Sequence, residues 1–444
     1  MKTTYLYFAA ALAMLSACST NEEYETVTNN GLQKVTFADP FVGKGLTKAS
    51  GDITTSNLTD FKVKVWGDLI HTYTTDGIVP DVKGSYTTHS TEAPFYNGYD
   101  IEHTSGWVPV NNKEYYYPRD KYYYRFVAFA PAEALEGDGA ISVSMDPNYQ
   151  TFSGATASDY GVSNVPLVQE IDNTSATKGG WDLLVSNRVL SSPSTDGITD
   201  RNAISFTFQH ILSRLSFYVY TTESAETTVK VKSIKAYLPK GATGRYRQNT
   251  ATDKPTVEGK TDNIYNSTNS TWSSATNDSW EWTSGFTDIT DVVTPTQFDA
   301  QVVNNTSNTY QEYEVQANNS GEEVKHSLAF SNAITDASIT KIGKEYFLAP
   351  TPANTTKVAQ YHFFVKVEYS VTENSITKNY TGYINLYDAD FYRFKQGWHH
   401  KLYLKLNSKK IRFITASVDN WENTEHKEDM TVSREVEGWT AEQH

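Results

Sequence analysis

The sequence is short of several residue types that often decide a fold. Among its 444 residues there is one cysteine, Cys18, and there are only 4 methionines. With no second thiol the chain can form no internal disulfide and no cysteine-ligated metal centre. After one short apolar stretch near the start, no run approaches the roughly 18 to 20 apolar residues that a membrane-spanning helix needs. The sequence therefore excludes disulfides and cysteine-ligated metals, and it predicts no retained transmembrane helix.

An excess of positive charge is also absent. The formal net charge is -14, and the acidic and basic residues are mixed along the chain. This balance argues against nucleic acid and anionic membrane surfaces as partners.

No catalytic constellation stands out either. The sequence has no His-Glu-x-x-His pair, and the neighbours His399 and His400 lie in a predicted strand or at its entry, where adjacent side chains point to opposite faces. His210 alternates with apolar residues and is predicted to be a hydrogen-bonded core residue. Asp388 and Asp390 fit either a calcium site or a turn before a strand. No phosphate-binding glycine loop and no nucleophile elbow occurs. We predict no enzyme, no metal and no cofactor.

Aromatic residues are abundant, with 30 Tyr, 20 Phe and 9 Trp. Aromatic and β-branched residues favour half-buried strands, and several segments alternate with the period of two that a strand requires. The predicted strands are Phe61–Trp66, Tyr122–Pro131, Ile204–Phe208, His210–Val219, Val229–Ile234, Tyr361–Tyr369, Tyr380–Leu386, Lys401–Leu406 and Ile411–Val418. Short strands separated by turn residues predict an all-β protein of sandwiches.

The length suggests two domains. We predict an N-terminal β-sandwich at 49–222 and a C-terminal one at 223–444. The stretch near 245–330 is rich in Asn, Ser and Thr. We interpret it as an insertion or as long surface loops in the second domain, and it can include short strands.

The start of the chain has the pattern of a secretory leader. Lys2 precedes the apolar stretch Tyr5–Leu15, which ends in Leu15-Ser16-Ala17-Cys18. This ending resembles the lipobox of bacterial lipoproteins. The resemblance implies that residues 1–17 are removed and that the Cys18 thiol is modified with lipid such as palmitate. An ordinary leader with a chance cysteine is the alternative.

After a polar tether, residues Val35, Phe37 and Phe41 alternate as in a strand with one buried face. The loop that follows, Val42–Ser50, is rich in glycine and small residues, and a trypsin-like protease could cleave it.

The order of these segments resembles that of the fimbrillin-like (Mfa-like) proteins, which are subunits of the type V pili of Gram-negative anaerobes. The most specific match is Phe206-Thr-Phe-Gln-His-Ile-Leu-Ser-Arg-Leu215. Phe126–Pro131, Asp182–Leu184, Gly397–Leu406 and Val418–Trp421 follow the same order. The resemblance covers most of the chain, and the stretch near 245–330 departs from it.

The resemblance implies two tandem Greek-key (transthyretin-like) β-sandwich domains. It also implies an outer-membrane lipoprotein precursor whose segment 18–48, with the tether and the first strand, is removed by a trypsin-like protease. Cleavage is expected between Lys48 and Ala49, with Lys44 as the lesser candidate. Other fimbrial subunits, in a homo- or hetero-polymer on the cell surface, are the expected partners, and adhesion is the expected role.

A strand from a neighbouring subunit would fill the vacated groove. In the C-terminal tail 422–444, the apolar residues Met430, Val432 and Val436 make a candidate donor strand, which Arg434 interrupts. A solvated acidic tail is an equal alternative, and the chain could be a stalk or a tip subunit.

A second hypothesis is a surface glycan-binding lipoprotein of a polysaccharide-uptake system. Its candidate sugar-stacking residues are Tyr96, Tyr99, Trp107, Trp272, Trp280 and Trp282, which in an all-β protein are more often core or interface residues.

Overall fold

The computed structural model describes residues 33–42, 53–71, 96–117, 123–135, 142–144, 161–171, 180–186, 188–191, 203–239, 243–247, 261–262, 265–266, 271–272, 280–283, 294–304, 310–326, 339–350, 363–385, 394, 396–408, 411–418, 431–437 and 439–443. Strands dominate these residues, and the all-β prediction is confirmed. No helix among the described residues is long and apolar enough to cross a membrane.

The strands form four sheets and one two-stranded ribbon. The nine-stranded sheet contains β1 (Phe41–Val42), β2 (Val63–His71), β3 (Tyr96–His103), β4 (Trp107–Pro109), β5 (Tyr123–Ala130), β9 (Leu184–Ser186), β10 (Arg188–Ser191), β11 (Thr207–His210) and β15 (Thr261–Asp262). The four-stranded sheet contains β6 (Ser142–Ser144), β7 (Gly161–Pro166), β14 (Thr243–Arg247) and β18 (Trp280–Thr283).

The six-stranded sheet contains β8 (Val168–Glu170), β12 (Ser213–Tyr220), β20 (Thr340–Leu348), β23 (His399–Leu406), β24 (Ile411–Val418) and β25 (Thr431–Glu437). The five-stranded sheet contains β13 (Thr228–Pro239), β19 (Tyr310–Glu323), β21 (Phe364–Glu373), β22 (Ile376–Asn385) and β26 (Trp439–Gln443). The ribbon is β16 (Tyr265–Asn266) with β17 (Thr271–Trp272), and the helical turns are η1 (Leu58–Asp60), η2 (Val110–Asn112), η3 (Ala132–Leu135), α2 (Pro295–Phe298) and η5 (Asp299–Val303).

The nine-stranded sheet buries both of its faces. Along β2, Val63 and Val65 face one apolar cluster while Trp66 faces another, and along β5 the same alternation separates Phe126 from Val127. This is the two-residue period of a pleated strand. The second cluster also includes residues of β7 and β14, so the four-stranded sheet packs on that face.

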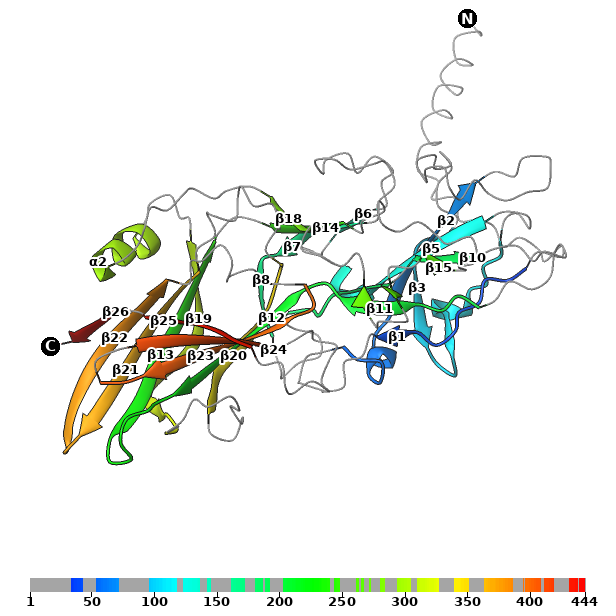
Figure 1. The fold of residues 1–444 in the computed structure, drawn as a ribbon. Helices are drawn as coiled ribbons and strands as arrows, with labels where there is room; N and C mark the ends of the chain where they lie inside the picture. Colours follow the sequence, from blue (N-terminus) through cyan, green and yellow to red (C-terminus); the bar gives the residue numbers. More distant parts are fainter. Residues whose placement is uncertain are drawn as a thin grey trace, which may run out of the picture.

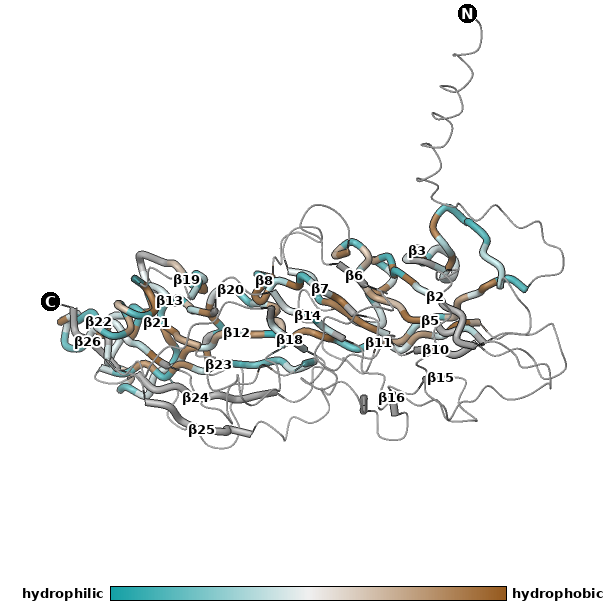
Figure 2. The backbone as a smooth tube through the Cα atoms, turned by 90° about the horizontal axis from the view of Figure 1, so that it is seen from above, coloured by the Kyte–Doolittle hydropathy of each residue, from teal (hydrophilic) through white to brown (hydrophobic). Residues whose placement is uncertain are grey.

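The six- and five-stranded sheets form a sandwich around the largest apolar cluster. Leu215 and Phe217 of β12 meet Val231 and Ile234 of β13 across this core. The sandwich lies at the opposite end of an elongated molecule from the nine-stranded sheet (Figure 1). Hydrophobic residues mark β12 and β7 along the middle of the molecule (Figure 2).

One continuous stretch of chain joins the two ends. β11 belongs to the nine-stranded sheet, and after Ile211 and Leu212 the chain continues as β12 of the six-stranded sheet. Both linking residues are fully buried. This stretch contains the Phe206–Leu215 motif, so the motif forms the connection. β12 pairs with β20 and β23, and its pairing therefore crosses the predicted domain boundary at 222.

One part of the stretch 245–330 forms a long strand of the five-stranded sheet. Residues Tyr310–Glu323 form β19, which pairs along β13 in the five-stranded sheet. Among the residues of β19 whose side chains are described, Val315 belongs to the main core, and Tyr313 packs against it. The outward face of β19 is polar, which explains why its composition resembles that of a loop.

The two sheets of the sandwich approach closely where β20 meets β19. Gly343 has φ of +69°, and a Cβ there would collide with the carbonyl oxygen of Val315. Only glycine combines this conformation with this approach.

Candidate functional site

Residues 33–42, here called the closing segment, complete the nine-stranded sheet. Its C-terminal part runs parallel to β11 and to the chain before it. The amide groups of Ala38 and Phe41 donate to the carbonyl oxygens of Ile204 and Phe206, at 2.9 Å in both cases, and β1 pairs with Thr207 and Phe208. The C-terminal end of the closing segment is therefore hydrogen-bonded to the β11 edge of the sheet.

The other end of the closing segment is bonded to a different edge. The amide of Val35 donates to the carbonyl of Tyr115 at 2.8 Å, and the amide of Tyr117 donates to Gln33 at 3.0 Å. These tyrosines follow β4 and η2 at the opposite end of the sheet order. The closing segment thus bridges two edges that are far apart in the sheet.

The side chains of the closing segment complete the apolar core. Val35 and Val42 are each 2% exposed, and Phe37 packs against the same cluster. The prediction that Phe41 shares the buried face is wrong, because its side chain is 40% exposed. The alternation changes phase at Pro40, which is buried, so that Val42 takes the inward position instead.

The chain after the predicted processing loop is fixed to the sheet by a buried carboxylate. Asp182 accepts hydrogen bonds from the amide of Ile53 at 2.8 Å and from Nδ1 of His210 at 2.9 Å. With the Asp182 oxygen as the acceptor, Nδ1 of His210 is the donor in this contact. The prediction that His210 is a hydrogen-bonded core residue is confirmed, because it is 2% exposed.

One threonine links the closing segment to this fixed region. The Thr55 hydroxyl accepts from the amide of Val42 and donates to its carbonyl, both at 3.0 Å. Thr55 therefore supplies both hydrogen bonds that a neighbouring strand would give to Val42.

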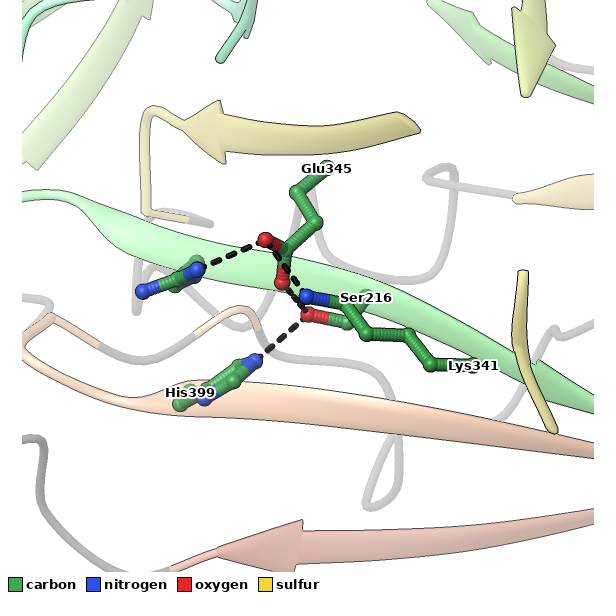
Figure 3. Close-up of polar contacts among 5 residues, drawn as sticks. Ser216, Lys341, Glu345 and His399 are labelled. Carbon is green, nitrogen blue, oxygen red and sulfur yellow. Dashed lines mark hydrogen bonds and ion pairs between the residues drawn. The ribbon is translucent and has the colours of Figure 1, made fainter. Parts of the chain in front are cut away.

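A second buried polar cluster lies where β12 enters the six-stranded sheet. Glu345 of β20 is bonded to Arg214 at 2.7 Å and to Lys341 at 2.8 Å, and it also accepts from the Ser216 hydroxyl. Nε2 of His399 lies 2.6 Å from the Ser216 oxygen. Because the hydroxyl hydrogen is given to Glu345, Nε2 is the donor in this contact. Figure 3 shows the chain of contacts from His399 through Ser216 to Glu345.

The charges in this cluster shift two pKa values. Burial alone would raise the pKa of Glu345, but the Arg214 cation and the hydrogen bonds from Lys341 and Ser216 lower it below its usual value. Burial, followed by the nearby Arg214 cation, lowers the pKa of His399 well below its usual value. Glu345 is therefore ionised and His399 neutral at neutral pH.

Several predicted site residues lie outside the described residues: Cys18, Lys44, Lys48, Ala49, Asp388, Asp390 and Met430. Val432 and Val436 lie in β25, where they pair with Ala416 and Phe413 of β24. The candidate donor strand is thus an edge strand of the chain's own six-stranded sheet.

The aromatic residues proposed for sugar stacking are mostly core residues. Tyr96, Trp107 and Trp280 are 0%, 5% and 2% exposed. Trp282 donates its indole N–H to the carbonyl of Pro350 at 2.8 Å. Tyr99 is half-buried, and Trp272 lies in β17, where only the backbone is described. Among the described residues, no group of three or more His, Cys, Asp or Glu is placed to hold a metal ion.

Sequence reasoning missed the roles of Asp182 and Thr55. Asp182 stood in the Asp-Leu-Leu motif, yet its partner Ile53 is 129 residues away. No local pattern reports such a contact, and a lone threonine in a polar stretch gives no signal at all.

The fold is that of an all-β protein whose N-terminal segment completes a sheet. No family model and no curated protein matches the chain. Among solved structures, the chain is similar to a fimbrial protein from Bacteroides vulgatus, at 14% identity, over 87% of this chain and 99% of that chain, with a TM-score of 0.46.

It is also similar to a fimbrial assembly protein from Parabacteroides distasonis, at 10% identity, over 87% of this chain and 97% of that chain, with a TM-score of 0.31. The fimbrial anchor protein Mfa2 from Porphyromonas gingivalis matches at 11% identity, over 80% of this chain and 88% of that chain, with a TM-score of 0.22. The likeness to these proteins is one of fold.

Proposed function

We propose that this chain is a structural subunit of a cell-surface fimbria of the type V class, with a role in adhesion. In this proposal it is exported as an outer-membrane lipoprotein anchored through Cys18. A trypsin-like protease then cleaves it after Lys48, and the closing segment leaves. A strand of a neighbouring subunit takes its place.

The observation that carries the proposal is the position of the closing segment between two sheet edges. Its loss would expose unpaired backbone groups at Ile204–Phe208 and at Tyr115–Tyr117, together with the apolar core beneath Val35 and Val42. Unpaired edges beside an apolar groove are a template for another strand. A strand from a second chain would satisfy the backbone and cover the core in one step.

The fixed region after the loop supports the same proposal. Ile53 and Leu58 are buried, and the Ile53 amide is held by Asp182. The chain after Ala49 can therefore stay in place while the chain before it departs. A head-to-tail contact of this kind does not close on itself, so repetition produces a filament.

The position of the subunit in the filament, stalk or tip, depends on the C-terminal tail. In the free subunit, β25 is bonded to β24 and β26 is bonded to β22. A stalk subunit that donates this tail would have to detach at least one of these strands, whereas a tip subunit can keep both.

The experiment is protease treatment of the purified full-length protein and of its Lys48→Ala variant, with Lys44→Ala as the matched control. We expect the wild type and the control to lose about 48 residues and to form polymers that resist detergent until boiled. The Lys48→Ala variant should stay monomeric. Normal maturation and polymerisation of Lys48→Ala would contradict the cleavage site, and a processed protein that never polymerises would contradict the function.

A further inference from the structure

Phe37 is the one aromatic side chain of the closing segment that packs inward. Its ring lies 5.8 Å from that of Tyr96 in an edge-to-face arrangement at 71°. It also lies 6.2 Å from the ring of Phe206, stacked at 24°. Phe37 therefore sits between an aromatic residue of β3 and one beside β11.

More rings surround this position. Tyr96 contacts the ring of Tyr115 at 4.6 Å and that of Tyr99 at 5.2 Å, both measured between ring centres. Burial raises the pKa of Tyr115 to about 12 and that of Tyr96 well above its usual value, so both phenols are neutral at physiological pH. We call Tyr96, Tyr99, Tyr115 and Phe206 the aromatic socket.

The socket is built from residues that stay in the chain after processing. Tyr96 and Phe206 are 0% and 1% exposed while Phe37 is in place. Loss of the closing segment would open a gap between their rings that only a flat aromatic group fills with the same edge-to-face and stacked contacts. Aliphatic side chains can cover the apolar surface but cannot reproduce these contacts.

We propose that the incoming strand is selected by an aromatic residue that enters the aromatic socket at the place of Phe37, two residues from a β-branched residue at the place of Val35. This inference rests on the proposed function and specifies the chemistry of the partner segment. The candidate donor Met430–Val436 carries no aromatic residue. Trp439 is the aromatic residue of the tail 422–444, but the residues two positions away, Glu437 and Ala441, are not β-branched. By this criterion the tail is a poor occupant, and the preferred donor is a strand of a different kind of fimbrial subunit.

The test measures peptide binding rather than filament formation. Full-length protein is cleaved by a trypsin-like protease, the released segment is separated, and a fluorescent peptide of residues Gln33–Val42 is titrated by anisotropy. Phe37→Leu should weaken binding about tenfold or more, since two ring contacts are lost, while Phe37→Trp should bind within about threefold of the wild type.

Phe41→Leu is the matched control, because it makes the same substitution at a 40% exposed position of the same peptide. It should bind like the wild type, and a peptide of Met430–Val436 should bind more weakly than either. Equal binding of the Phe37→Leu and wild-type peptides would overturn the socket while leaving strand exchange intact. Absence of any binding by the wild-type peptide would overturn both the socket and the proposed function.

Discussion

Replacing Glu345 by glutamine tests whether the buried polar cluster stabilises the junction of β12 with the six-stranded sheet. The Arg214 and Glu345 side chains are 1% and 3% exposed. Glu345→Gln keeps the size of the side chain but removes its charge, so the buried Arg214 cation loses the counter-charge that lies 2.7 Å from it. Breaking a buried pair in this way costs about 3 to 5 kcal/mol.

For a domain of this size, such a loss lowers the midpoint of thermal unfolding by about 6 to 20 °C. The assay is thermal unfolding of the purified full-length protein, followed by circular dichroism and by differential scanning calorimetry. The matched control is Glu170→Gln, since Glu170 is bonded to Lys344 at 2.9 Å with both side chains exposed, at 48% and 44%. An exposed pair contributes about 0 to 1 kcal/mol, so this variant should hardly move the midpoint.

A double variant separates loss of charge from loss of packing. Arg214→Met with Glu345→Leu removes both buried charges and keeps apolar volume, so it should recover most of the stability that Glu345→Gln loses. If Glu345→Gln shifts the midpoint no further than Glu170→Gln does, the buried cluster does not stabilise the junction.

Two further predictions concern the same structure. The pKa of His399 is lowered in the folded protein, so at this position the unfolded chain binds a proton near pH 6.5 while the folded protein does not. The contribution of His399 to the free energy of unfolding should be constant above about pH 6.5 and fall below it, by at most about 1.4 kcal/mol per pH unit. His399→Gln should reduce this slope in urea titrations at pH 5 to 7. Thr55→Val removes both hydrogen bonds to Val42 and keeps the shape of the side chain. The cleaved closing segment, carrying a label, should therefore dissociate about 5 to 100 times faster. An unchanged rate of release would show that Thr55 does not retain the segment.

Local alternation predicted several of the core strands and missed others, among them β3 and β20. Ile411–Val418 coincides with β24, and Tyr122–Pro131 contains β5 (Tyr123–Ala130). β5 buries both of its faces in the usual period of two, so local pattern and tertiary packing agree there. β19 escaped prediction because its partner β13 and its core supply the stabilisation that its own polar residues do not.

The candidate site was predictable only in part. The first strand and the apolar roles of Val35 and Phe37 could be read from the sequence, but Pro40 shifts the phase and places Phe41 outside. The contact with Tyr115–Tyr117 could not be predicted, because it joins segments about 80 residues apart in the sequence. Contacts such as Glu345 with Arg214, 131 residues apart, have no local signature.

The uninterrupted passage from β11 to β12 has a mechanical consequence. Ile211 and Leu212 are the only residues between the two strands, and their backbone is tied on both sides, by the Ile211 amide to Leu183 and by the Leu212 carbonyl to Gly397, each at 2.9 Å. A hinge needs residues that can rotate, and these cannot. Each molecule should therefore bend little at the β11–β12 connection, and a pulling force along the molecule passes through the covalent backbone there. The elasticity of any chain of such molecules then resides in the contacts between neighbouring molecules.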